Sequence, residues 1–352
     1  MVTLREIAKM ANVSVGTVSR VLNDLDRVSP QTRQKVKDII KETGYTPDNS
    51  AVSLARRSGN KPRASKKRRK SRTIGFIYWE KYVGTISLEP VYSSVMEGAQ
   101  RFYQESNNLF RIRVIPKDFD CNTEPETIID NDMDGVIMAG EVPTEIINYI
   151  IKNEIPSVHF GSSCRYSDTS TLVMPDNFNG AYTAVKHLVS LGHKYIAFIS
   201  NNNRRISFTE RMRGYVAAII ESKLELKPDY YCYEGQGELG GYQVMPTMLE
   251  LKQPPTAFFC ANDEIAFSVL KYCTEHRINI PEEISVVGFD DTNYAGYSVP
   301  ALTTVRQPMV QSGVVAATEL IRAITTQNYI ARKIVLKTEL VIRSSTGAPP
   351  VA

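Results

Sequence analysis

Residues 3–23 read TLREIAKMANVSVGTVSRVLN and residues 28–48 read VSPQTRQKVKDIIKETGYTPD, and these stretches decide the fold of the N-terminal part. Apolar residues recur in them every three or four positions, which is typical of short amphipathic helices. Ser14 is a good N-cap for the second helix, and Ser29-Pro30 opens the third, because Ser accepts from a free backbone N–H and Pro lacks one. Gly44 is expected to end the third helix. The predicted inward residues are Leu4, Ile7, Ala8 and Ala11, then Val18, Val21 and Leu22, then Val36, Ile39 and Ile40.

Two helices joined by a short turn, with a third helix over their apolar faces, define a helix-turn-helix module. In such a module the second helix enters the DNA major groove with its N-terminal residues first. Arg20 could pair with guanine, and Thr17 and Ser19 suit phosphate contacts. The spacing alone equally allows a plain solvated surface. The outward residues of this helix are Val15, Gly16, Thr17, Ser19, Arg20 and Asn23.

The charge of the chain is divided unevenly. Residues 56–72, RRSGNKPRASKKRRKSR, hold ten Lys or Arg and no acid, and residues 1–55 have a net charge of +2. The whole chain has a net charge of +4, so the remaining residues carry −8. A basic N-terminal section on an acidic body favours a polyanionic partner for the N-terminus. Residues 58–72 are either a linker extended by its own repulsion or a non-specific DNA contact.

From Thr73 onward short apolar runs alternate with helical patterns, which predicts an α/β body of two lobes with parallel sheets. The strand candidates are Ile74–Tyr78, Gly135–Ala139, Ser157–Phe160, Tyr195–Ser200, Thr256–Cys260, Ser285–Phe289, Lys333–Leu336 and Glu339–Ile342.

Polar residues follow two of these strands, at the edge where open parallel sheets bind ligands. They are Ala261-Asn262-Asp263 and Asp290-Asp291-Thr292, and Arg211 is predicted to open a nearby helix. Such amide, carboxylate and guanidinium groups together suit the adjacent hydroxyls of a sugar.

Composition narrows the class of protein. The 352 residues are 42% hydrophobic and 23% charged, which is typical of a globular chain of two or three domains. No apolar run is long enough to span a membrane, so no membrane partner is expected. The five scattered cysteines form no CxxC pair, which indicates neither a disulfide framework nor a zinc site and favours a cytoplasmic location. Asp290-Asp291 has no accompanying nucleophile or metal set, so we expect neither catalysis nor a cofactor.

The segment from Ala11 to Asn23, with residues 28–48 after it, resembles the DNA-binding head of the lac/galactose repressor family of bacterial transcriptional regulators. In that family the two residues after the capping Ser select the operator sequence, and here they are Val15 and Gly16. The resemblance implies DNA contacts by Thr3, Ser14, Val15, Gly16, Thr17, Ser19, Arg20 and Asn23.

Residues 47–56, PDNSAVSLAR, resemble the hinge of the same family. There a short helix orders on DNA, and a leucine from each subunit enters the minor groove. The resemblance implies DNA contacts by Asn49, Ala51 and Leu54, with a plain linker as the alternative. The connector that follows, residues 58–72, is longer and more basic than is usual in the family.

The body resembles the inducer-binding core of that family, which is similar to periplasmic sugar-binding proteins. The matching stretches include GAYTAVKHLVSLGHKYIAFIS at 180–200, ERMRGY at 210–215, CANDEIAF at 260–267, ISVVGFDDT at 284–292 and LTTVRQP at 302–308. The resemblance implies that Arg211, Asn262, Asp290 and Gln307 contact the effector.

We therefore expect a DNA-binding domain over 1–46, a hinge helix over 47–57, a basic linker over 58–72 and an effector-binding and dimerisation core over 73–347, with an N-lobe of about 73–162 and 293–323 and a C-lobe of about 163–291 and 328–347. One small head reads too few base pairs alone, so a homodimer on double-stranded operator DNA is expected. The resemblance implies a repressor of carbohydrate-utilisation genes controlled by a sugar between the lobes. Control by a purine corepressor or by a phosphocarrier protein is the alternative.

Overall fold

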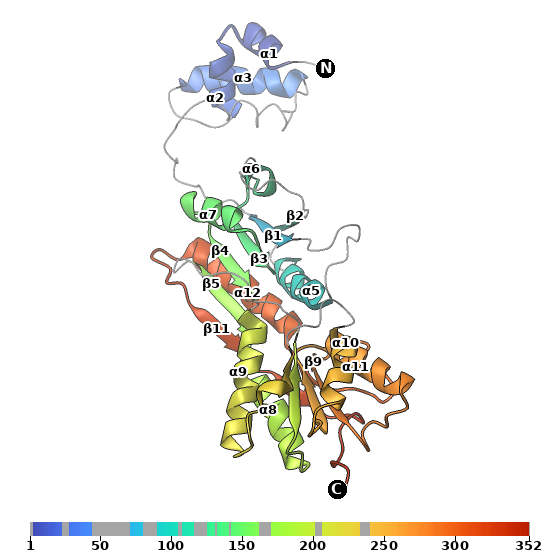
Figure 1. Ribbon diagram of the computed structural model, residues 1–352. Helices are drawn as coiled ribbons and strands as arrows, with labels where there is room; N and C mark the ends of the chain where they lie inside the picture. Colours follow the sequence, from blue (N-terminus) through green and yellow to red (C-terminus); the bar gives the residue numbers. More distant parts are fainter. Residues whose placement is uncertain are drawn as a thin grey trace. The chain divides into compact units, whose positions relative to one another are not determined.

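The chain forms two compact units that divide between Arg68 and Arg69, as seen in the computed structural model (Figure 1). The structure describes residues 3–22, 28–43, 71–79, 90–104, 108–115, 125–130, 132–140, 142–161, 170–200, 206–232 and 240–351. Asn23, the predicted hinge over 47–57 and most of the basic linker lie outside the described residues.

The first unit contains three helices: α1 (Leu4–Ala11), α2 (Val15–Leu22) and α3 (Pro30–Thr43). Asn12, in the left-handed conformation (φ 53°), ends α1 and lets the chain turn into α2. The apolar faces of the three helices meet in one small core. Its fully buried members are Ile7, Ala8, Ala11, Val18, Val21 and Val36. The helical periodicity of the sequence therefore predicted this unit correctly.

The second unit contains two six-stranded sheets, and the first has the strand order β11-β5-β4-β3-β1-β2 with every pair parallel. Helices α5 and α12 pack on one face of this sheet, and α6 and α7 pack on the other. The strands are β1 (Thr73–Trp79), β2 (Leu109–Ile115), β3 (Gly135–Ala139), β4 (Ser157–Phe160), β5 (Thr171–Pro175) and β11 (Lys333–Leu336), and the helices are α5 (Pro90–Gln104), α6 (Pro125–Ile128), α7 (Thr144–Lys152) and α12 (Met309–Thr325).

The second sheet has the order β12-β10-β9-β8-β6-β7, and only the β10–β12 pair is antiparallel. In Figure 1, α8 and α9 lie together beside this sheet, and α10 and α11 lie together at its other side. The strands are β6 (Ile196–Ile199), β7 (Tyr231–Cys232), β8 (Ala257–Cys260), β9 (Ser285–Asp290), β10 (Thr303–Arg306) and β12 (Glu339–Val341), and the helices are α8 (Asn177–Ser190), α9 (Ile206–Glu221), the 3-10 turn η1 (Pro228–Tyr230), α10 (Gly240–Leu249) and α11 (Asp263–Glu275).

All eight predicted strands are present, and the two-lobed α/β fold is confirmed. The sequence analysis missed β2, β5, β7 and β10. It was also wrong about Arg211, which lies inside α9 rather than at its start, since α9 already begins at Ile206. No helix among the described residues is long and apolar enough to cross a membrane.

The chain passes between the two lobes three times, and each predicted boundary is misplaced by one strand. The chain leaves the first sheet after β5 and not near residue 162, returns after β10 and not near 292, and leaves again after β11 and not near 325. Each of these strands pairs with the sheet that the chain is leaving: β5 with β4, β10 with β9 and β11 with β5. Pairing with that sheet satisfies the backbone hydrogen-bonding groups of these strands.

Candidate functional site

The start of α2 is organised by the side chain of Ser14. Its Oγ accepts a hydrogen bond from the backbone N–H of Thr17 at 3.1 Å, as predicted for an N-cap, and lies 2.9 Å from the Thr17 hydroxyl. Thr3 caps α1 in the same way, and Glu6 bonds back to the Thr3 N–H at 2.7 Å, which completes a capping box. The hydroxyls of these three predicted DNA contacts therefore lie at the N-termini of helices, where phosphates also bind well.

The N-terminal end of α2 presents an open surface. Val15, Gly16 and Arg20 are exposed, whereas Val18 and Val21 on the opposite face are buried. Among the described residues, a Cβ added at Gly16 would meet only the Ser14 Oγ, at 3.6 Å, so the described part of the head leaves space beside it. The side chain of Ser19, together with Asn23, Asn49, Ala51 and Leu54, falls outside what the structure describes.

In the second unit, three predicted effector contacts come together at the C-terminal edge of the second sheet. A guanidinium nitrogen of Arg211, from α9, lies 3.3 Å from Oδ1 of Asp290, at the end of β9. The Gln307 amide, just after β10, donates a hydrogen bond to the same oxygen. The Arg211 and Asp290 side chains are only 5% and 13% exposed. A largely buried carboxylate thus pairs with two donor groups that come from separate elements.

Arg211 is fixed on its other sides as well. Its Nε donates to Oδ1 of Asn177 at 2.9 Å, and Nη1 donates to the carbonyl of Ala261. The guanidinium lies 3.7 Å from the centre of the Phe289 ring, which adds a cation–π contact. The sequence analysis did not select Asn177. The signal was available, since Asp176-Asn177 follows an apolar run, but that run (β5) was not recognised as a strand.

Asn262, the fourth predicted contact, has a different local role. Its Oδ1 accepts from the backbone N–H of Ile265 at 3.0 Å and caps α11. Its Nδ2 donates to Glu264 at 3.4 Å. The residues on either side of it join the cluster instead: Ala261 through its carbonyl to Arg211, and Asp263 through a buried carboxylate.

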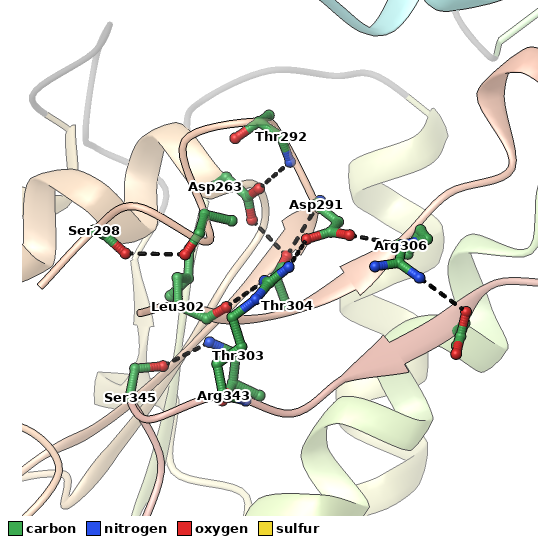
Figure 2. Close-up of polar contacts among 12 residues, drawn as sticks. Asp263, Asp291, Thr292, Ser298, Leu302, Thr303, Thr304, Arg306, Arg343 and Ser345 are labelled. Atoms are coloured by element: carbon green, nitrogen blue, oxygen red, sulfur yellow. Dashed lines mark hydrogen bonds and ion pairs between the residues drawn. The ribbon is translucent and has the colours of Figure 1, made fainter. Parts of the chain in front are cut away.

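Two further carboxylates surround the turn after β9, and neither was selected as a site residue (Figure 2). Asp291 accepts from Arg306 at 2.7 Å and from Arg343 at 2.6 Å. Asp263 is fully buried and accepts from the Thr304 hydroxyl at 2.5 Å and from the Thr292 N–H at 2.7 Å. Burial raises the pKa of Asp263 to about 6, although both hydrogen bonds oppose the shift. An Asp directly after Asn262, at a strand end, was the sequence signal.

These groups suit the binding of a polar molecule. The cluster supplies fixed guanidinium, amide and carboxylate groups at a strand edge, which is where ligands bind in open parallel sheets. Among the described residues, no group of three or more His, Cys, Asp or Glu side chains could hold a metal ion. The fold and these surfaces define a helix-turn-helix regulator with a two-lobed α/β ligand-binding core.

Comparison with known proteins gives the family. Residues 3–48 match the model of bacterial regulatory proteins of the lacI family, and residues 185–346 match a periplasmic binding protein-like domain. The chain is 31% identical over 350 residues to the probable HTH-type transcriptional repressor ExuR of Bacillus subtilis (strain 168), covering 98% of each chain. The chain therefore belongs to the lacI family of DNA-binding transcriptional repressors, and the relative is a regulator rather than an enzyme.

Two solved structures are similar over nearly the whole chain. The complex of the transcriptional regulator CelR with cellobiose superposes with a TM-score of 0.71 and 26% identity, covering 98% of this chain and 100% of the other. The lac repressor dimer bound to operator and the anti-inducer ONPF has a TM-score of 0.68 and 25% identity, covering 99% of each chain. The head-plus-core organisation inferred from the sequence is confirmed.

Proposed function

We propose that two copies of the chain bind a pseudo-palindromic operator and repress the adjacent genes. The exposed N-terminal end of α2, with Val15, Gly16 and Arg20, supports a role in reading the major groove. The similar lac repressor is described as a dimer on operator DNA, which supports the homodimer. Because operator DNA lies in the bacterial cytoplasm, the protein acts there. Ser14, Thr17, Thr3, Ser19 and Asn23 contact the backbone or bases beside it, and Asn49, Ala51 and Leu54 contact the minor groove.

We infer that operator binding is controlled by a sugar that contacts Arg211, Asn262, Asp290 and Gln307. The observation that carries this proposal is the pre-set geometry of Arg211 and Gln307 on Asp290. Three elements supply these groups, and buried charged groups fixed in this way bind sugar hydroxyls with little loss of side-chain entropy. The cellobiose bound to the similar CelR supports a saccharide as the ligand class.

Control requires that the effector prefer one arrangement of the two lobes. A compound that binds both arrangements equally leaves operator affinity unchanged, however tightly it binds. Residues 176, 307–308 and 337–338 connect the two sheets, and Gln307 is one of the proposed contacts. An effector that binds at Gln307 is therefore placed at a connection through which the lobes reorient.

The experiment is an operator-affinity measurement with a panel of compounds. Operator fragments are first selected from random DNA with the full chain, and fluorescence anisotropy then gives their Kd with cellobiose, common monosaccharides, purine bases or a phosphocarrier protein added. We expect one saccharide to change the operator Kd about tenfold or more, which is within the range of allosteric coupling. A response to a purine or to the phosphocarrier alone would replace the sugar proposal. If the selection from random DNA yields no preferred sequence, the operator proposal is contradicted.

A further inference from the structure

We propose that Asp263 is a positioning residue of the effector site: its buried carboxylate fixes the turn Asp290–Thr292 and thereby the direction in which Asp290 meets the effector. The inference rests on the proposed function at one point, namely that Asp290 contacts the effector. The effect of Asp263 on the turn is inferred from the contacts of Asp263 alone and does not require the effector.

The carboxylate of Asp263 reaches across one strand to bond the next. Asp263 begins α11 directly after β8, whereas Thr304, which donates to its Oδ1, lies on β10. Strand β9 runs between β8 and β10, and Gly288 of β9 is the register partner of Thr304. A Cβ at Gly288 would lie 2.4 Å from Oδ1 of Asp263, far closer than atoms can approach. Gly288 therefore leaves the space through which Asp263 passes.

The other oxygen of Asp263 holds the turn after β9. Oδ2 accepts from the backbone N–H of Thr292 at 2.7 Å (Figure 2). The two residues before Thr292 have positive φ, 126° at Asp290 and 53° at Asp291, a conformation that side-chain-bearing residues rarely adopt. Such a conformation persists only where surrounding contacts enforce it. The bond to Asp263 is one such contact, and it acts on the backbone that directs the Asp290 carboxylate towards Arg211.

Three carboxylates meet here, and two of them have an arginine. Asp290 pairs with Arg211, and Asp291 pairs with Arg306 and Arg343. Within the described part of the chain, Asp263 forms no ion pair, and its acceptors are satisfied by a hydroxyl and a backbone N–H.

The surroundings of Asp263 make its charge sensitive to pH. Burial raises the pKa of Asp263 to about 6, the hydrogen bonds from Thr304 and Thr292 oppose this shift, and the charge of Asp291 adds to it. The thiol of Cys260 on β8 also interacts with the Asp263 carboxylate. Arg306 and Arg343 pair with Asp291, the neighbouring carboxylate. A protonated Asp263 can donate to the Thr304 hydroxyl and still accept from the Thr292 N–H, but its carboxyl is then neutral, and a hydrogen bond to a neutral acceptor is weaker than one to a carboxylate. The hold on the turn should therefore weaken as the pH falls through about 6.

The test compares four full-length chains: wild type, Asp263→Asn, Gly288→Ala and Gly296→Ala. Asp263→Asn keeps the shape of the side chain and removes the charge, whereas Gly288→Ala keeps the charge and displaces the carboxylate. Gly296→Ala is the matched control, because an added Cβ there meets nothing within 4 Å. Two quantities are measured: the Kd for cellobiose by calorimetry from pH 5 to pH 8, and the amide hydrogen exchange of the peptide containing Thr292, by mass spectrometry at pH 7.5.

We expect exchange of the Thr292 amide to be about tenfold faster in Asp263→Asn and Gly288→Ala, since the acceptor of its hydrogen bond is neutral in the first variant and displaced in the second, and unchanged in Gly296→Ala. The cellobiose Kd should rise about tenfold in the first two variants. In wild type the cellobiose Kd should rise as the pH falls from 7 to 5, and in Asp263→Asn it should not. A merely structural role of Asp263 would not produce this difference in pH dependence. Unchanged exchange in Asp263→Asn, or a wild-type Kd and pH profile in that variant, overturns the inference. If wild type binds no cellobiose, the sugar proposal loses its support, and the exchange of Thr292 still decides the role of Asp263.

Discussion

Arg211 and Asp290 form a buried ion pair, with a guanidinium nitrogen 3.3 Å from Oδ1 of the carboxylate. They come from α9 and from the end of β9, far apart in the sequence. Burying two charges is costly unless both are well paired. Asn177, Ala261 and the Phe289 ring complete the surroundings of the guanidinium, and Gln307 completes those of Asp290.

Replacing Arg211 by Met should lower the free energy of unfolding by about 3 kcal/mol, because Asp290 is left buried without its counter-charge. The same variant should lose the response of operator binding to the effector. Urea unfolding and operator anisotropy measure the two effects. Arg213→Met is the control, since Arg213 lies on the same helix with a side chain 62% exposed and pairs only at the surface with Glu210. If the two variants have equal free energies of unfolding, the claim that Arg211 compensates the charge of Asp290 is contradicted.

Gly16→Ala should stabilise α2 and change the operator preference. Alanine is favoured over glycine inside a helix by about 1 kcal/mol, and the head leaves room for the added methyl group. Slower amide exchange across α2 measures the first effect, and a binding selection from random DNA measures the second. If α2 is stabilised and the selected sequences do not change, Gly16 does not lie at the DNA interface.

His159 should make the stability of the core fall in acid. It is buried on β4, and among the described residues its Nε2 has no hydrogen-bond partner. Burial lowers its pKa from 6.5 to about 4, so the unfolded chain binds the proton more readily than the folded chain. Stability is therefore complete above pH 6.5 and declines as the pH falls towards 4, by roughly 3 kcal/mol in all. Urea unfolding of His159→Leu at pH 7.5 and pH 5 should lack this part of the decline. An identical decline in wild type and variant would show that His159 does not titrate as described.

Ser345→Ala should cost about 2 kcal/mol of unfolding free energy. The Ser345 hydroxyl is buried, donates to the carbonyl of Val286 at 2.6 Å and accepts from the N–H of Thr303 at 2.8 Å. Its loss removes one hydrogen-bond partner from each of these two buried backbone groups beside the second sheet. The neighbouring Ser344 is exposed, and Ser344→Ala should change stability by less than about 0.5 kcal/mol. Comparable losses from the two substitutions, read by thermal unfolding, would rule out this explanation.

Local patterns in the sequence were sufficient for most of the fold. The periodicity of residues 4–40 and the capping by Ser14 and Ser29 depend on neighbours within a few positions, and the structure agrees with both. The short strands β5 and β10 gave no comparable signal, because each is fixed by pairing with a distant strand. For that reason the first two lobe boundaries were predicted one strand too early.

Only part of the site was predicted, again because some of its residues are placed by pairing between distant strands. Arg211, Asp290 and Gln307 were selected, and they lie in one cluster. Asn177 and Asp263 were not selected, although both form hydrogen bonds there. To predict Asn177, the strand β5 before it has to be recognised. To predict Asp263, one has to know that its carboxylate passes over Gly288, which only the order of the strands in the sheet reveals.

The central claim is that a small molecule bound to the core and operator DNA bound to the heads influence each other. The most direct test is to titrate the responding compound into the full chain alone and into its operator complex, with calorimetry giving both Kd values. We predict two unequal values, whose ratio equals the factor by which the compound changes the operator Kd, because coupling between two binding sites is reciprocal. Equal Kd values with and without operator would contradict this claim.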